Sequence, residues 1–161
     1  MAITSPAELK RASALAADAS AEHGEVAARL RLVITRTARR LRQEAGAELS
    51  PSQAAALATI ERHGPLTPSE LASLERVQRP TATRIVARLE SEGLVERAAD
   101  PGDGRSFIVS VTPQGQALLR KLRTRKNAYL ARQLRGLDPD ELAALARAAE
   151  ILERLQGGER G

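Results

Sequence analysis

The sequence contains no cysteine among its 161 residues. A chain without thiols has no disulfide framework, no cysteine-based metal site and no thiol redox sensor. Only two aromatic residues are present, Phe107 and Tyr129, so the hydrophobic core must be built from aliphatic side chains. Proteins that bind single-stranded nucleic acid stack the bases on aromatic side chains, and the scarcity of aromatics argues against that class.

Long apolar runs are missing as well. No stretch reaches the roughly 20 apolar residues that a membrane-spanning helix needs, and the first residues lack the basic and then apolar pattern of a secretory signal. We therefore expect a cytoplasmic protein without a membrane partner. An apolar content of 42% and a charged content of 28% are typical of a folded globular chain.

The charge balance is basic, with 25 Lys and Arg against 20 Asp and Glu. The net charge of +5 suits a polyanionic partner, either nucleic acid or an anionic membrane surface. Arg dominates over Lys, which can reflect the base composition of the gene as easily as recognition of guanine. Charge alone therefore does not identify the partner.

Five dipeptides mark helix starts, because each places a capping residue directly before a proline. The capping side chain accepts a free N–H of the first turn, and proline at the first helical position loses nothing by lacking its own N–H. In four of the five, a Glu or Gln three residues after the cap can complete a capping box. The dipeptides are Ser5–Pro6, Ser50–Pro51, Thr67–Pro68, Thr112–Pro113 and Asp138–Pro139.

Apolar residues at helical spacing predict a helix after each of these starts and another at 79–92. We expect Gly24 to bend the first helical region or to divide it into two helices, at 6–22 and about 26–41. The apolar stripes of the terminal helices are too long for a small central domain to cover. A second copy of the chain is the simplest partner for them.

Residues 67–113 have the order of a winged helix-turn-helix: helix, turn, helix, strand, glycine-rich hairpin, strand. The predicted strands are Leu94–Arg97 and Phe107–Val111, joined by a hairpin that contains Pro101 and two glycines. The fold class is thus mainly α with a small β-wing. Such a fold offers one helix to the major groove of DNA and a hairpin tip to the minor groove.

The helix at 79–92 turns Arg79, Arg84 and Arg88 away from its apolar face, together with Thr81 and Thr83. Arg donates bidentately to guanine, and Thr offers a methyl group to thymine or a hydroxyl to phosphate. For an isolated helix, a solvated basic face would be the simpler interpretation. The short helix before it and the hairpin after it favour DNA recognition.

The hairpin tip carries Asp103 and Arg105, and an Asp–Arg pair there would direct the cation. A directed Arg fits the narrow and electronegative minor groove. An ordinary Asp-Gly turn is the simpler interpretation of the tip taken alone. Its place shortly after the candidate recognition helix favours the DNA-binding interpretation.

These motifs resemble the MarR family of winged-helix transcriptional regulators. The resemblance rests on Arg79–Val86, Gly93–Arg97, the segment Asp100–Arg105 and Val111–Gly115. It implies a homodimer that binds a pseudo-palindromic double-stranded operator, and a repressor that a small aromatic or phenolic anion releases from DNA. The DNA-binding residues that it implies are Gln78, Arg79, Pro80, Thr81, Thr83, Arg84, Arg88, Asp103 and Arg105.

Two residues depart from the family pattern. Gln78 stands where relatives often carry a Ser cap, and Gly104 replaces the first of two basic residues in the wing.

We expect four regions: 1–48 and 113–156 with dimerisation helices, 49–112 as the DNA-binding domain, and 157–161 as a disordered tail.

Two other functions stay open on the sequence. The first is a winged-helix protein-interaction module that binds no DNA, and the second is a small-molecule enzyme or scavenger built on the dimer pocket. No nucleophile–base pattern or phosphate-cradling loop is present, so we expect no catalysis and no cofactor. His23 and His63 are far apart in the sequence, and we expect no metal site.

Two basic clusters, at 29–42 and 120–135, contain no acidic residue. We expect most of these side chains to be solvated, with their stems packed on apolar surface. Alternatives are that they cradle an anionic ligand or pair with the acidic last helix across a dimer.

Overall fold

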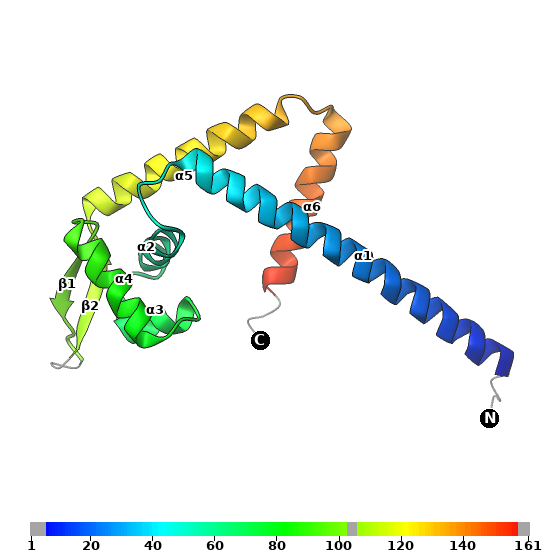
Figure 1. The fold of residues 1–161 in the computed structure, drawn as a ribbon, viewed down its shortest axis with the longest axis horizontal. Helices are drawn as coiled ribbons and strands as arrows, with labels where there is room; N and C mark the ends of the chain where they lie inside the picture. The colour runs from blue at the N-terminus through cyan, green and yellow to red at the C-terminus, as the bar shows by residue number, and fades with distance from the viewer. Residues whose placement is uncertain (1–5, 103–105, 158–161) are drawn as a thin grey trace. The chain divides into compact units, whose positions relative to one another are not determined.

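In the computed structural model the chain is mainly helical with one β-hairpin, as the sequence predicts (Figure 1). The structure describes residues 6–102 and 106–157. Contacts within the chain divide it after Leu41 into two compact units. The elements are α1 (Pro6–Ala45), α2 (Pro51–His63), α3 (Pro68–Leu74), α4 (Arg79–Ser91), β1 (Val95–Ala99), β2 (Phe107–Val111), α5 (Pro113–Leu134) and α6 (Pro139–Gly157).

The helix α1 runs without interruption through Gly24, so the predicted break there is wrong. A glycine inside a helix costs only about 1 kcal/mol relative to alanine, which good helix formers on both sides can offset. No proline lies between Pro6 and Pro51 to reinforce a break. The helix ends instead next to Gly46, whose φ of +94° belongs to the left-handed region.

The predicted caps of the later helices are confirmed. Ser50 and Thr67 each form a complete capping box, with Gln53 and Glu70 as the reciprocal partners. Asp138 and Glu141 exchange the same two hydrogen bonds before α6, at 2.8 and 3.1 Å. These starts are therefore fixed by residues within four positions of one another.

The hairpin is antiparallel and pairs Val95 with Val111 and Ala99 with Phe107. β1 begins one residue later and extends two residues farther than predicted. A bridge between Leu66 and Val109 adds the loop before α3 to the edge of β2, through hydrogen bonds of 3.1 and 2.8 Å. Backbone pairing thus joins the hairpin to the helical part of the domain.

Aliphatic side chains from α2, α3, α4, the hairpin and α5 form one core, as the low aromatic content requires. Each fully buried Leu, Ile or Val contributes about 1.5–3 kcal/mol relative to an exposed one. The largest fully buried side chains are Leu57, Ile60, Leu71, Val86, Leu89 and Val109.

Most side chains of the basic cluster of α5 are exposed, as the sequence predicts, and four of them also form ion pairs within the chain. Lys121 and Arg125 both bind Glu48, with N–O distances of 2.8 and 3.0 Å. Arg125 also donates to the carbonyl of Ala45 at the end of α1, at 2.9 Å. Two further pairs are Arg123–Glu61 and Arg132–Glu44. The acidic partners lie in the same chain, before α5.

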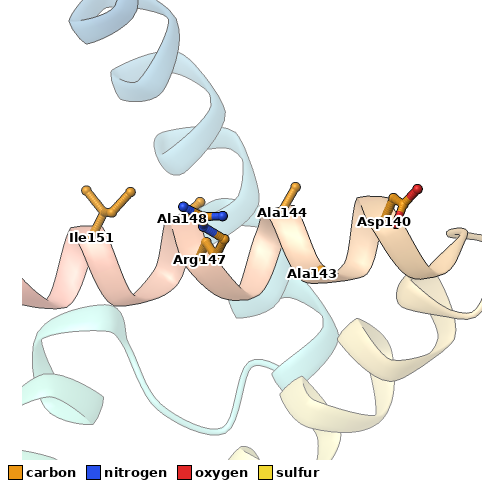
Figure 2. Close-up of a pocket in the computed structure, with 6 residues that line it drawn as sticks. All are labelled: Asp140, Ala143, Ala144, Arg147, Ala148 and Ile151. Carbon is orange, nitrogen blue, oxygen red and sulfur yellow. The ribbon is translucent and has the colours of Figure 1, made fainter.

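The helix α6 carries a row of side chains along one side (Figure 2). Asp140, Ala144, Arg147 and Ile151 belong to this row and help to line a shallow pocket of about 440 Å³. Four large apolar residues of α6 are between 47% and 67% exposed, namely Leu142, Leu145, Ile151 and Leu155.

No helix within the described part of the chain is both long and apolar enough to span a bilayer.

Gly115 and Gly24 give a matched pair of stability predictions. A Cβ on Gly115 would lie 2.2 Å from the carbonyl oxygen of Leu94, so Gly115→Ala must displace backbone. A Cβ on Gly24 would meet nothing within 4 Å. We expect Gly115→Ala to lower the free energy of unfolding by about 3 kcal/mol and Gly24→Ala to raise it by up to about 1 kcal/mol. Urea unfolding at a fixed protein concentration measures both, and a neutral Gly115→Ala would contradict the packing described.

Acid should destabilise the fold through Glu48 and Glu70. Hydrogen bonding from Lys121 lowers the pKa of Glu48 below 4.5, and the backbone N–H of Thr67 lowers the pKa of Glu70 in the same direction. A lowered folded-state pKa gives stability that is present above the unfolded-state pKa and is lost as the pH falls through the folded-state value.

We therefore expect the free energy of unfolding to fall as the pH drops below 4.5, and to fall less steeply in Glu48→Gln. Lys121→Gln removes the other partner of this ion pair, so the free energy of unfolding should also depend less steeply on pH in that variant. Urea titrations across this range measure the slope, and an equally steep loss in Glu48→Gln would contradict the assignment.

Candidate nucleic-acid interface

A tight turn connects α3 to α4. Val77 donates its N–H to Ala72 O at 2.9 Å, and Glu75 donates to Leu71 O at the same distance. Between them Arg76 has a φ of +52°, a left-handed conformation that residues other than glycine adopt infrequently. This turn packs α3 and α4 together as a helix-turn-helix.

The two sides of α4 differ sharply in exposure. Ala82, Val86 and Leu89 have no exposed surface and face the core. Residues predicted to contact DNA lie on the other side of the helix and at its start. Gln78, Arg79, Pro80, Thr83, Arg84 and Arg88 are exposed, and Thr81 is half-buried.

Two hydrogen bonds and one ion pair orient these side chains. The hydroxyl of Thr83 donates to Arg79 O at 3.0 Å, and Arg84 Nη2 lies 3.5 Å from Thr81 Oγ1. Arg88 Nε is 2.7 Å from a carboxylate oxygen of Glu92, four residues along. Arg88 is therefore held by an acidic neighbour, which the sequence analysis did not consider.

Gln78 occupies the N-cap position of α4, and its side chain makes no capping hydrogen bond. This agrees with the expectation from the sequence that Gln78 is a weaker cap than serine. An uncapped helix start leaves N–H groups directed outward, and such groups together with the helix dipole favour an anion.

A groove beside α4 contains residues that the sequence analysis missed. Its volume is about 320 Å³, and α2 contributes Ser52 and Gln53 to it, with Ser50 at the N-cap. The amide of Gln53 also reaches Glu92, at 3.5 Å, so α2 is connected to the residue that holds Arg88. The capping motif at Ser50 predicted where α2 begins, but nothing local predicted that this start adjoins α4.

The base of the hairpin is fixed to the end of α4. Thr112 donates its hydroxyl to Gly93 O at 2.7 Å, and Gln114 donates to Glu92 O at 3.3 Å. Toward the tip, the N–H of Gly102 donates to Asp100 Oδ1 at 2.8 Å, which begins a turn. Asp103 and Arg105, predicted to contact DNA, lie outside the described residues.

A second cleft, of about 460 Å³, lies between α2 and α5. Ala54, Ala58, Leu119 and Leu122 give it apolar walls. Its charged residues are Glu61, Arg62, Arg123 and Lys126, and Arg123 is paired with Glu61.

Comparison with known proteins agrees with this architecture. The model of the MarR family matches residues 49–107. An HTH-type transcriptional regulator from Mycobacterium tuberculosis is 38% identical over 128 residues, which cover 79% of this chain and 90% of that protein. The HTH-type transcriptional repressor MdtR from Bacillus subtilis is 32% identical over 120 residues, with coverage of 70% and 77%.

Solved structures show the same fold. A crystal structure of a Pseudomonas aeruginosa protein assigned as a transcriptional regulator matches with a TM-score of 0.75 at 35% identity, covering 84% of this chain and 97% of that one. A mutant of MarR from Escherichia coli matches with a TM-score of 0.68 at 26% identity, with coverage of 76% and 92%. The sequence, the helix-turn-helix and the hairpin thus agree, and the chain belongs to the MarR family of winged-helix, DNA-binding transcriptional regulators.

Proposed function

We propose that the protein is a homodimeric, cytoplasmic repressor that binds a pseudo-palindromic DNA operator and carries out no catalysis. In this proposal, α4 enters the major groove and the wing reaches the adjacent minor groove. The contacting residues would be Gln78, Arg79, Pro80, Thr81, Thr83, Arg84 and Arg88 from α4 and its cap, and Asp103 and Arg105 from the wing.

The observation that carries this proposal is the two-sided character of α4. Three fully buried apolar residues fix the helix in the domain, while three arginines and two threonines lie on its other sides. Arg supplies bidentate donors to guanine, and Thr supplies a methyl group or a hydroxyl. A helix of 13 residues presents this pattern directly after a helix-turn-helix turn.

The dimer is supported by the exposed apolar side chains of the terminal helices. Leu142, Leu145 and Leu155 on α6 are each at least 47% exposed, and α1 exposes Val33 and Ile34 to a similar extent. Several exposed apolar side chains along one helix commonly mark an interface between proteins. A two-fold dimer places two recognition helices in successive major grooves about 34 Å apart, which matches a pseudo-palindrome.

Arg84→Ala tests the role of α4. We expect it to weaken binding to the cognate duplex by about 1–3 kcal/mol and to reduce the preference for cognate over shuffled sequence. The duplex would cover the region upstream of the protein's own gene, and fluorescence anisotropy would measure both affinities.

Arg120→Ala is the matched control, because Arg120 is an exposed arginine on α5 and its loss removes the same charge. We expect a small and equal loss on both duplexes. If Arg84→Ala also weakened both duplexes equally, α4 would contribute charge but not sequence recognition.

We further propose that a small aromatic or phenolic anion releases the protein from DNA by binding in the cleft between α2 and α5. The volume of about 460 Å³ lies within the range for small-molecule sites. Apolar walls suit an aromatic ring, and Lys126, which is half-buried, suits its carboxylate or phenolate. To release DNA, the ligand must bind the DNA-free conformation more tightly than the DNA-bound one.

Lys126→Gln tests this site, with 2-hydroxybenzoate as the probe. We expect the variant to bind DNA normally and to need about tenfold more probe for half-maximal release, since a charged hydrogen bond is lost. Lys121→Gln is the control, because Lys121 pairs with Glu48 and does not line the cleft. An identical response of both variants and the wild type would contradict the assignment.

A further inference from the structure

Arg97 on β1 contacts both α4 and the other strand of the hairpin. Its Nη2 atom lies 2.8 Å from Glu90 Oε2, and Glu90 belongs to the last turn of α4. Its guanidinium carbon lies 4.4 Å from the centre of the Phe107 ring on β2. One side chain therefore connects the candidate recognition helix to both strands of the wing.

The strand register explains how Arg97 reaches the ring. Arg97 pairs with Val109 and Ala99 pairs with Phe107, so Arg97 and Phe107 are diagonal neighbours on one face of the hairpin. A cation over an aromatic face is attracted by the ring quadrupole. The side chain of Arg97 is only 31% exposed, so solvent screens its two interactions less than it would screen those of a fully exposed pair.

Arg97 also lies farther along the hairpin than the other bonds to α4. Thr112 and Gln114 bind the backbone at Gly93 and Glu92, which fixes only the base of the wing. Among the hydrogen bonds and ion pairs of the described residues, the bond of Arg97 is the one farthest along β1 that reaches α4. At the same level, Leu66 bonds the backbone of Val109, the register partner of Arg97, so the β2 edge is held by Leu66 and the β1 edge is held to α4 by Arg97.

We propose that Arg97 is a positioning residue that holds the wing at one angle to α4. The proposal rests on the function proposed above, since a fixed angle matters when helix and hairpin bind the same duplex in neighbouring grooves. A hairpin that swings freely loses that freedom when it binds DNA, and the loss weakens affinity. Arg97 restricts the hairpin in the free protein, so less freedom is lost on binding.

Distance measurement tests the positioning itself, without DNA. Because the chain has no cysteine, Ala87→Cys on α4 and Ala99→Cys on β1 give a doubly spin-labelled protein with no competing thiol, and both positions are exposed. We expect a narrow distance distribution that broadens or shifts when Arg97→Met is added. Arg123→Met, which removes the ion pair with Glu61, should leave it unchanged. An unchanged distribution in Arg97→Met would overturn the proposal.

A second experiment tests whether the positioning serves DNA binding. It measures whether Glu90→Gln raises or lowers the affinity for DNA. Glu90→Gln removes a negative charge, which by electrostatics alone strengthens binding to a polyanion. If Arg97 positions the wing through Glu90, the same variant should instead weaken binding to the cognate duplex by roughly 3- to 10-fold. The control is Glu96→Gln, a neighbouring exposed acid on β1, which should strengthen binding slightly.

Arg97→Lys should restore most of the affinity lost in Arg97→Met, because Lys keeps the charge beside the carboxylate and the ring. Strengthening by Glu90→Gln to the same extent as by Glu96→Gln would overturn the positioning role and favour direct contact of Arg97 with phosphate. If the wild type bound no duplex, the function proposed above would fail, while the distance measurement would still decide whether Arg97 holds the hairpin.

Discussion

The outward side chains of α4 are held in place because the opposite face of the same helix is completely buried. Ala82, Val86 and Leu89 have no exposed surface, and they pack against residues of α2, α3 and the hairpin. Removing one such side chain would leave a cavity, and the helix could then shift toward it. The direction of every arginine on α4 therefore depends on aliphatic packing in the interior of the domain.

A second level of organisation comes from polar contacts that join elements distant in sequence. Backbone bonds connect Leu66 to Val109, and Thr112 holds the start of the hairpin at Gly93. The bonds of Leu66 act on the β2 edge at Val109, halfway along the strand, and Thr112 acts at the base of the hairpin. The ion pair and ring contact of Arg97 act at the same level on the β1 edge, so Arg97 connects to α4 the edge of the hairpin that the bonds of Leu66 do not reach.

The sequence predicted those parts of the fold that depend on short-range interactions. Capping residues before proline correctly located the starts of α2, α3, α5 and α6, because a cap and its partner are three residues apart. The break predicted at Gly24 is absent, because the small cost of one glycine is offset by its helical neighbours. The pairs of α5 with Glu48 and Glu61, and the position of Ser52 beside α4, join residues far apart in the chain. Local patterns carry no information about such pairs.

The central claim is that a winged domain of this chain recognises a specific DNA sequence. The most direct test is a titration of the wild-type protein with a labelled duplex from the region upstream of its gene, beside a shuffled duplex, at two salt concentrations. We expect tight binding to the first duplex, and much weaker binding to the second that falls steeply as salt rises. Equal and weak binding to both duplexes would contradict it, and would favour a winged-helix module that binds another protein.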